Sequence, residues 1–228
     1  MASSVRESGS SRRIEPPAAP SDRTRRLALI ACAAAVVLFA IVAAVSYGQS
    51  YVAEPLDRWW SELMLDQRTE TGLVLAWIPA VIGGPISMLI IGLVLVGTLL
   101  YLRWKLVALI VAAAMVASVA LAAPLAAVVA RTRPEGSLAE SVPTSFPSGH
   151  TAMAATVAVV LGLVLRHWLV WLLGALWVIV MAWSRTYLQA HWLTDVIAGA
   201  LLGVIAGTVV WYGIETIRSR RAASDPAS

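Results

Sequence analysis

Runs of about twenty uncharged apolar residues recur along this chain of 228 residues and limit what it can fold into. Each run is long enough to cross the hydrocarbon core of a bilayer, about 30 Å thick, as one α-helix. Hydrophobic residues make up 59% of the chain and charged residues only 13%, whereas a typical soluble domain is about one quarter charged. The sequence therefore predicts an integral membrane protein of the all-α class, a bundle of transmembrane helices.

Six spans are predicted, at about 27–48, 84–102, 106–130, 149–165, 168–184 and 193–214. They place residues 25–216 in one membrane domain. Residues 1–24 are rich in Ser, Pro, Ala and charge and predict a disordered tail, and residues 217–228 form a second short tail. Basic residues precede the first apolar run, so a secretory signal peptide is the alternative there. The length of that run favours a retained helix.

The segment 49–71 is polar and acidic, yet it carries an apolar side. Its apolar residues fall close to one side of a possible helix: Trp59, Trp60, Leu63 and Met64. An amphipathic helix of this kind lies in the membrane interface, so we expect the segment to rest against lipid. Apolar character resumes at Gly72, and the second span is expected to begin near the break at Gly83-Gly84-Pro85.

The basic residues predict the orientation of the bundle. Six spans put both termini on one side, and most of the 17 Lys and Arg residues lie in the tails and in the turns at 103–105 and at Arg166. The positive-inside rule places that side in the cytoplasm. The protein is therefore expected in the cell membrane, with the polar segments 49–71, 131–150 and 184–192 extracytoplasmic. The net charge of +4 is explained by topology, so no nucleic-acid partner is expected.

Three polar clusters lie at the extracytoplasmic ends of the predicted spans. They are Arg131-Thr132-Arg133-Pro134, Pro147-Ser148-Gly149-His150, and Ser184-Arg185 followed by His191 and Asp195. Polar and charged groups next to hydrocarbon are costly, so such clusters mark either a functional site or a tightly paired structural one.

His191 and Asp195 are four residues apart and would share one face of a helix. The carboxylate could then accept a proton from one imidazole nitrogen and leave the other nitrogen as a nucleophile or base. The alternative is an ordinary pair that caps the start of the sixth span.

The second cluster opens the fourth span. Unpaired N–H groups at a helix start attract anions, and Gly149 would let an anion approach closely. Ser148 would add a donor, and His150 could protonate a leaving oxygen. The alternative is simple N-capping by Ser148 with a solvated histidine beside it.

The arginines suit phosphate oxygens, because a guanidinium is a planar donor of several hydrogen bonds. Arg133 and Arg185 are the stronger candidates. For Arg131 and Arg133, the alternative is a loop charge near lipid headgroups, and this alternative is favoured for Arg131.

Together the clusters resemble the type 2 phosphatidic acid phosphatase family, part of the acid phosphatase and vanadium haloperoxidase superfamily. The pattern of that family is a lysine, six residues and Arg-Pro; then Pro-Ser-Gly-His; then Ser-Arg, five residues, His, three residues and Asp. Here the second and third blocks match in full, and the first matches only at Arg133-Pro134, because Ala126 occupies the lysine position. The resemblance covers roughly residues 27–214.

The resemblance implies a lipid phosphatase that forms a phosphohistidine intermediate. His191 would attack phosphorus, Asp195 would orient it, and His150 would protonate the leaving group. Phosphate oxygens would be held by Arg133, Arg185, Ser148 and Gly149, with Arg131 as a possible replacement for the missing lysine. The scheme requires no metal and no cofactor, and the expected partners are a phosphorylated lipid and the bilayer.

Two classes of function follow. The first is an enzyme that acts on phosphatidic acid, phosphatidylglycerophosphate or an isoprenoid diphosphate such as undecaprenyl diphosphate. The second is a catalytically weak relative that binds phospholipid, motivated by Ala126. A transporter is a more distant third, because the second and third spans carry no charge in their interiors.

Overall fold

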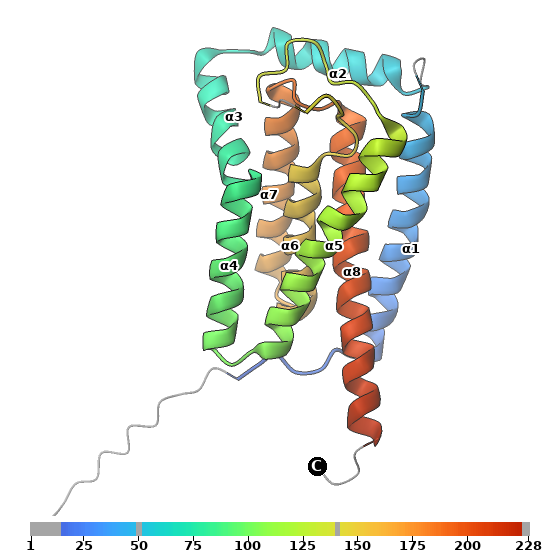
Figure 1. Cartoon of the computed structure of the whole chain (residues 1–228), viewed down its shortest axis with the longest axis vertical. Coiled ribbons are helices and arrows are strands. Elements are labelled where there is room, and N and C mark those ends of the chain that lie inside the picture. The colour runs from blue at the N-terminus through green and yellow to red at the C-terminus, as the bar shows by residue number, and fades with distance from the viewer. Residues whose placement is uncertain (1–14, 49–51, 140–141, 225–228) are drawn as a thin grey trace, which may run out of the picture.

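The computed structural model describes residues 15–48, 52–139 and 142–224, and within these ranges the chain forms eight helices and no extended sheet (Figure 1). The helices are α1 (Asp22–Val45), α2 (Glu54–Asp66), α3 (Glu70–Ile82), α4 (Pro85–Tyr101), α5 (Lys105–Val129), α6 (Gly149–Leu165), α7 (Trp168–Tyr187) and α8 (Leu193–Ser224). Most of them run along the long axis of the bundle, whereas α2 crosses one end of it.

Four helices, α1, α5, α7 and α8, are long and apolar enough to cross a membrane. The pair α3 and α4 makes a fifth candidate, bent by 51° at the break between them. The helix α6 is also apolar but has only 17 residues. The chain is thus an all-helical protein with four or five candidate spans among its described residues, and the predicted number of six is not established.

The predicted second span, 84–102, coincides with α4, which begins at Pro85 directly after the break. The apolar helix that precedes the break, α3, was not predicted. The interruption arises because Pro85 has no N–H to continue the helix, and the Gly84 N–H turns back to the carbonyl of Val81.

The helix ends also differ from the predicted tails. The helix α1 begins at Asp22, where the Ser21 side chain accepts a hydrogen bond from the Thr24 N–H, so residues 22–24 are helical. The helix α8 continues through Ser224, ten residues beyond the expected end. The remaining parts of the two predicted tails, 1–14 and 225–228, lie outside the described residues.

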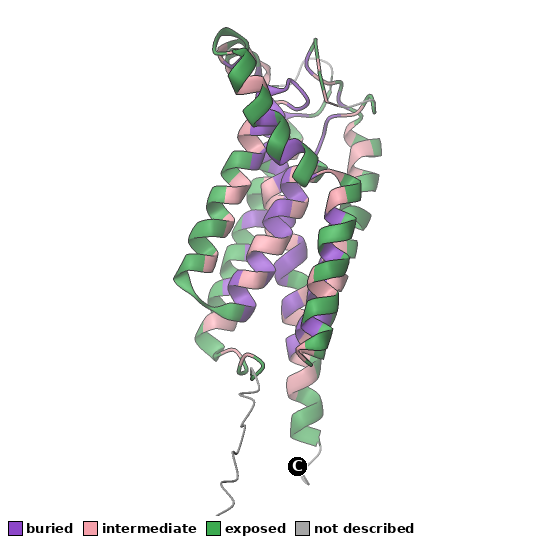
Figure 2. Cartoon of the chain, turned by 90° about the vertical axis from the view of Figure 1, so that its left-hand side faces the viewer, coloured by how far each residue is buried: buried purple, intermediate pink, exposed green. Residues whose placement is uncertain are grey.

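The core of the bundle forms where α6 packs along α8, the most extensive contact between any two helices described. Three glycines spaced by four residues, Gly199, Gly203 and Gly207, face α6. A Cβ atom on Gly203 would lie 2.6 Å from Ala155 Cβ and 2.8 Å from the Thr156 nitrogen. Small residues at this spacing let two helix backbones approach closely, and α6 accordingly has the largest share of buried residues among the described helices. Figure 2 shows the buried residues gathered in the interior of the bundle.

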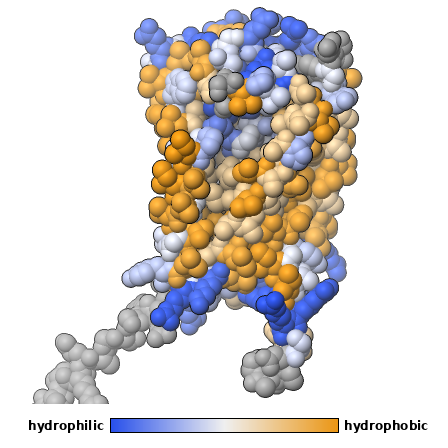
Figure 3. Space-filling model, in the orientation of Figure 1, coloured by the Kyte–Doolittle hydropathy of each residue, from blue (hydrophilic) through white to orange (hydrophobic). Residues whose placement is uncertain are grey.

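The outer surface is an apolar belt between two hydrophilic ends (Figure 3). Large hydrophobic side chains are exposed on α1, α4, α5 and α7, for example Val37, Leu93, Val116 and Leu173. A water-soluble monomer rarely exposes apolar patches of this extent. The belt therefore fits the hydrocarbon of a membrane.

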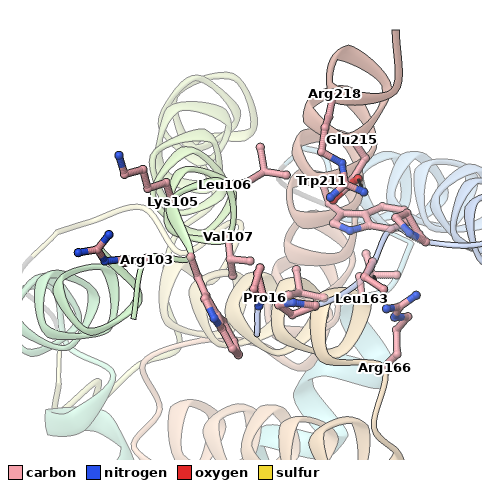
Figure 4. Close-up of a pocket in the computed structure, with 15 residues that line it drawn as sticks. Pro16, Arg103, Lys105, Leu106, Val107, Leu163, Arg166, Trp211, Glu215 and Arg218 are labelled. Carbon is pink, nitrogen blue, oxygen red and sulfur yellow. Dashed lines mark hydrogen bonds and ion pairs between the residues drawn. The ribbon is translucent and has the colours of Figure 1, made fainter. Parts of the chain in front are cut away.

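A small cavity of about 280 Å³ lies at the end of the bundle opposite α2, among α5, α6 and α8 (Figure 4). Pro16 and the residues after it line the cavity together with Trp211. Arg166 donates hydrogen bonds to the carbonyls of Ala18 and Ala19. The described start of the chain is thus tied to the end of α6.

The glycine contact predicts a difference between two matched substitutions on α8. Gly203→Ala places a methyl group against the backbone of α6 and should destabilise the fold by about 1–3 kcal/mol, the usual cost of overpacking. Gly213→Ala is the control, because nothing lies within 4 Å of a Cβ atom there. Thermal unfolding in detergent should show a lower Tm for Gly203→Ala alone. Equal Tm values for the two variants would contradict the tight contact.

Candidate active site

A cavity of about 780 Å³ lies between α4, α5 and α6, beneath the segment that joins α5 to α6. Among the described residues, its polar end is lined by Arg133, Gly149, His150 and His191. The remaining lining is mostly apolar and comes mainly from α4, α5 and α6: Gly83, Pro85, Met88, Leu89, Met115, Val116, Val119, Ala120, Val142, Pro147 and Met153. The surface is hollowed between the α3–α4 column and α5 (Figure 3). The structure therefore joins a small polar site to a larger apolar space.

His191 lies in the turn between α7 and α8 and is only 4% exposed. Its Nδ1 atom is 2.7 Å from the carbonyl oxygen of Ser145. A carbonyl oxygen accepts but does not donate, so Nδ1 carries the proton and Nε2 keeps a lone pair. Nε2 lies 3.4 Å from Nη1 of Arg133, at the polar end of the cavity.

The surroundings of His191 favour the neutral ring. Burial is the largest effect that lowers the pKa of His191 well below its usual range, and the positive charges of Arg185 and Arg133 lower it further. The hydrogen bond to Ser145 opposes these effects only in part. A neutral imidazole with a lone pair on Nε2 is the form that can act as a nucleophile.

Asp195 does not orient His191 in the way the sequence predicted. Its Oδ2 atom is 3.9 Å from His191 Nδ1, which is too long for a hydrogen bond. The reason is that α8 begins only at Leu193, so the histidine precedes the helix and bonds to Ser145. Oδ2 instead accepts the Trp192 N–H at 2.9 Å, which satisfies a donor at the helix start. The capping alternative describes this carboxylate better.

Arg133 is fixed by three backbone carbonyls around the mouth of the cavity. Its guanidinium donates to Val142 at 2.6 Å, to Thr144 at 2.6 Å and to Ala190 at 2.5 Å. Two of these carbonyls belong to the segment before α6 and one to the turn before α8. The arginine therefore ties the two segments together while its Nη1 atom faces His191.

The start of α6 lies at the same end of the cavity. Ser148 is the N-cap, and its side chain is buried against Thr151, outside the cavity lining. Gly149 does line the cavity, and nothing lies within 4 Å of a Cβ atom built on it. Open space thus faces the first helical residue, where backbone N–H groups are available to an anion.

His150, the second residue of α6, lines the same cavity as His191 and lies next to the break between α3 and α4. Its ring hydrogen-bonds to the backbone of Ala80 in α3. That carbonyl lacks its usual helical donor, because the Gly84 N–H bonds to Val81 instead. The irregular break therefore has a use in positioning His150.

The two remaining predicted arginines lie in different surroundings. Arg185 is 1% exposed near the end of α7, close enough for its charge to act on both histidines. Arg131 is also buried, but it lies outside the cavity lining. Its guanidinium bonds to Asp57, Thr194 and Asp195. The two carboxylates hold the guanidinium outside the cavity. Arg131 therefore does not take the place of the missing lysine there, contrary to the prediction.

Sequence reasoning missed Asp57, Thr194 and the Ser145 carbonyl. Asp57 is fully buried in α2, on the same side of the helix as Ser61 and Met64. Asp57 precedes Ser61 by four residues and Met64 by seven, which is the spacing of one face of a helix. A carboxylate on the inward face of an amphipathic helix is the signal that could have revealed it. A backbone carbonyl such as that of Ser145 leaves no comparable signal.

The pKa of His191 makes a prediction about its charge. Because the pKa is lowered, the ring should be neutral at pH 6.5, where an ordinary histidine is about half protonated. Nitrogen-15 NMR of labelled histidine can measure this, since the chain has only 3 histidines and His191→Gln identifies the relevant signal. The signal should report a proton on Nδ1 and none on Nε2. A ring half protonated near pH 6.5 would contradict the assignment.

Two curated proteins match parts of this chain. The undecaprenyl-diphosphatase of Sulfolobus acidocaldarius is 46% identical over 68 residues, which is 29% of this chain and 32% of that protein. YbjG of Escherichia coli, provisionally named an undecaprenyl-diphosphatase, is 39% identical over 70 residues, 29% of this chain and 35% of that protein. The matched part of the chain spans about a third of the length of these relatives.

Two solved structures share the fold. The PAP2-type phosphatidylglycerolphosphate phosphatase of Bacillus subtilis superposes with a TM-score of 0.74 at 22% identity, over 82% of this chain and 96% of that one. LpxE of Aquifex aeolicus gives a TM-score of 0.60 at 25% identity, over 68% and 94%. The model of the PAP2 superfamily matches residues 106–219, a region that contains every residue lining the polar end of the cavity. This match covers half of the sequence, and the chain belongs to the PAP2 superfamily.

Proposed function

We propose that this protein is a phosphoric ester hydrolase that removes phosphate from a membrane lipid through a phosphohistidine on His191. One observation carries the proposal. The proton on Nδ1 of His191 is bound to Ser145, so Nε2 carries a lone pair, which meets only a long contact of 3.4 Å from Nη1 of Arg133 at the polar end of a large apolar cavity. A binding protein has no need of a nucleophile fixed in this way.

The reaction takes two steps. Nε2 of His191 attacks phosphorus while the bond to the leaving oxygen breaks, and His150 gives that oxygen a proton. Water then attacks the phosphohistidine, His150 takes a proton from the water, and inorganic phosphate leaves with His191 restored. Both histidines line the cavity, as this scheme requires.

The charge on the phosphate is balanced by groups from three parts of the chain. Arg133 is already directed toward His191 and is fixed by backbone carbonyls. Open space lies beside Gly149, the first residue of α6, and the N–H groups at a helix start are unpaired and attract anions. The charge of Arg185 acts from the end of α7. Donors fixed before the substrate arrives stabilise the transition state without reorganisation.

The apolar part of the cavity accommodates the lipid. Leu89 of α4 and Val116 and Val119 of α5 line it and are also exposed on the apolar belt. A hydrocarbon chain could therefore lie between α4 and α5 while the phosphate reaches His191. The distribution of basic residues favours an extracytoplasmic site with both termini cytoplasmic.

The names of the relatives favour an isoprenoid diphosphate as the substrate. Both curated relatives are named for undecaprenyl diphosphate, whereas the Bacillus subtilis enzyme is named for phosphatidylglycerolphosphate. A diphosphate and a phosphomonoester present the same terminal group to His191. The long apolar cavity suits either lipid, so the choice depends on the assay.

The second candidate is a catalytically weak relative that binds phospholipid. The observation that favours it is the position of Arg131, because this residue is bound to Asp57 and Asp195 and does not replace the lysine missing at Ala126. Loss of one donor from a transition-state site typically lowers the rate by roughly 10² to 10³.

Phosphate release from purified protein in detergent, measured with and without chelator, tests the proposal. The substrates are phosphatidic acid, phosphatidylglycerophosphate and undecaprenyl diphosphate. We expect turnover that His191→Ala abolishes, because His191 supplies the nucleophile in the proposed reaction. Acid-labile, base-stable phosphate on the wild-type protein, quenched during turnover and absent from His191→Ala, would identify the phosphohistidine intermediate. Folded protein that binds these lipids without turnover would instead support the weak relative, and turnover lost with chelator would exclude metal independence.

Gly149→Ala gives a sharper test of the phosphate position. The methyl group meets open space in the protein, so the fold should be unchanged, but it would occupy the place of a phosphate oxygen. We expect kcat/KM to fall at least about tenfold, the equivalent of about 1.4 kcal/mol. Gly213→Ala is the matched control, since its Cβ atom also meets open space, far along α8. Unchanged kcat/KM in Gly149→Ala would place the phosphate elsewhere.

A further inference from the structure

Four polar side chains form a buried cluster where α8 begins: Asp57, Arg131, Thr194 and Asp195. Arg131 donates to Oδ2 of Asp57 at 2.5 Å and to Oδ1 of Asp195 at 2.7 Å. Thr194 donates its hydroxyl to Asp57 at 2.7 Å and its backbone N–H to the same carboxylate at 2.9 Å. Two carboxylates thus share one guanidinium and one helix start.

The cluster lies next to the site without entering it. None of its four residues lines the cavity. Asp195 nevertheless accepts the Trp192 N–H, and Trp192 directly follows His191 in the chain. The indole N–H of Trp192 also donates to the carbonyl of Thr132, between the two arginines of the first cluster. A continuous series of hydrogen bonds therefore connects Asp57 on α2 with the turn that carries His191.

The charges of the cluster are not required merely to dock α2. A second contact anchors the same helix. The Ser61 hydroxyl donates to the side-chain oxygen of Gln189, and the Gln189 side-chain amide donates to the backbone carbonyl of Ser61. Met64 is buried beside it in an apolar cluster with Ala76 and Leu188. Replacing a buried ion network by apolar residues is often neutral or stabilising. The stability of the fold therefore does not by itself explain why residue 57 is a carboxylate.

We propose that Asp57 is a positioning residue for His191, acting through Arg131, Thr194 and Asp195. By accepting the Thr194 N–H and one side of Arg131, Asp57 fixes the first turn of α8. Asp195 then holds Trp192, so the His191 ring stays with Nδ1 on Ser145 and Nε2 toward the phosphorus. The inference rests on the proposed function, since the purpose of the geometry is attack by Nε2.

Asp57→Asn is the direct test. The amide has nearly the same shape, but it removes the charge and places a donor against Arg131 or Thr194. Small displacements of a reacting group commonly lower a rate by up to about 10². We expect kcat to fall about 10- to 100-fold with KM within about twofold of wild type, because the cavity that binds the lipid is untouched.

Two controls separate positioning from general damage to α2. Asp66→Asn makes the same chemical change on an exposed residue of the same helix and should leave kcat unchanged. Ser61→Ala removes the hydroxyl bond of the second anchor, while the Ser61 backbone carbonyl keeps its bond from Gln189 and both carboxylates stay on Arg131. It should lower kcat less than Asp57→Asn does. An equal loss in Ser61→Ala would overturn the proposal, because any loosening of α2 would then suffice.

A spectroscopic measurement is independent of turnover. Nitrogen-15 NMR of His191 reports which ring nitrogen carries the proton. In Asp57→Asn, the Nε2–H form should become detectable, whereas the wild type and Asp66→Asn should show Nδ1–H alone. If the wild type lacks His191-dependent turnover, the proposed function fails. In that case the tautomer of His191 in Asp57→Asn alone tests the positioning role of Asp57. A His191 ring that remains wholly in the Nδ1–H form in this variant overturns the inference.

A second pair of variants applies if Asp57→Asn does not fold. Thr194→Val removes the hydroxyl between Asp57 and Arg131 while both charges stay in place. It should lower kcat in the same direction with KM maintained, and Thr194→Ser should recover most of the loss. An unchanged kcat in Thr194→Val, or in a folded Asp57→Asn, overturns the proposal.

Discussion

The hydrocarbon of the membrane imposes one constraint on which the rest of the structure depends: every backbone N–H and C=O within it needs a partner in the protein. Helices satisfy this requirement along their length, so unpaired backbone groups are left only at helix ends and breaks. In this chain, the polar end of the cavity lies where α6 and α8 begin, near the end of α7 and the break between α3 and α4. The groups that a bundle has to leave unpaired are the ones that the site employs.

Backbone carbonyls, more than side chains, set the geometry of that site. Ser145 fixes the tautomer of His191, and three other carbonyls hold Arg133. A further contact joins His150 to the backbone of Ala80. Irregular segments are therefore as necessary as the helices, since a regular helix would spend these carbonyls on its own hydrogen bonds.

The sequence predicts the fold well where a single local signal decides the outcome. The helix α5 matches its predicted span almost residue for residue, because an uninterrupted apolar run follows Arg103-Trp104-Lys105. The convergence of Arg133, His150 and His191 was also predictable, since all three lie at span ends on one side. By contrast, the choice of Ser145 over Asp195 as the partner of His191 depends on where α8 begins, and helix boundaries are poorly encoded. The contact between Arg131 and Asp57 joins residues more than 70 positions apart, and no local pattern announces it.

Part of the cavity wall also belongs to the outer apolar belt, and this affects how the protein encounters its lipid. Leu89 and Val116 border the cavity and the exposed apolar surface at once. The site is thus continuous with the solvent in which its lipids dissolve, and that solvent is the bilayer or the micelle rather than water. Encounter is governed by the mole fraction of the lipid within that phase. Added detergent therefore acts as a diluent and a competitor, so an apparent KM has meaning only as a surface concentration.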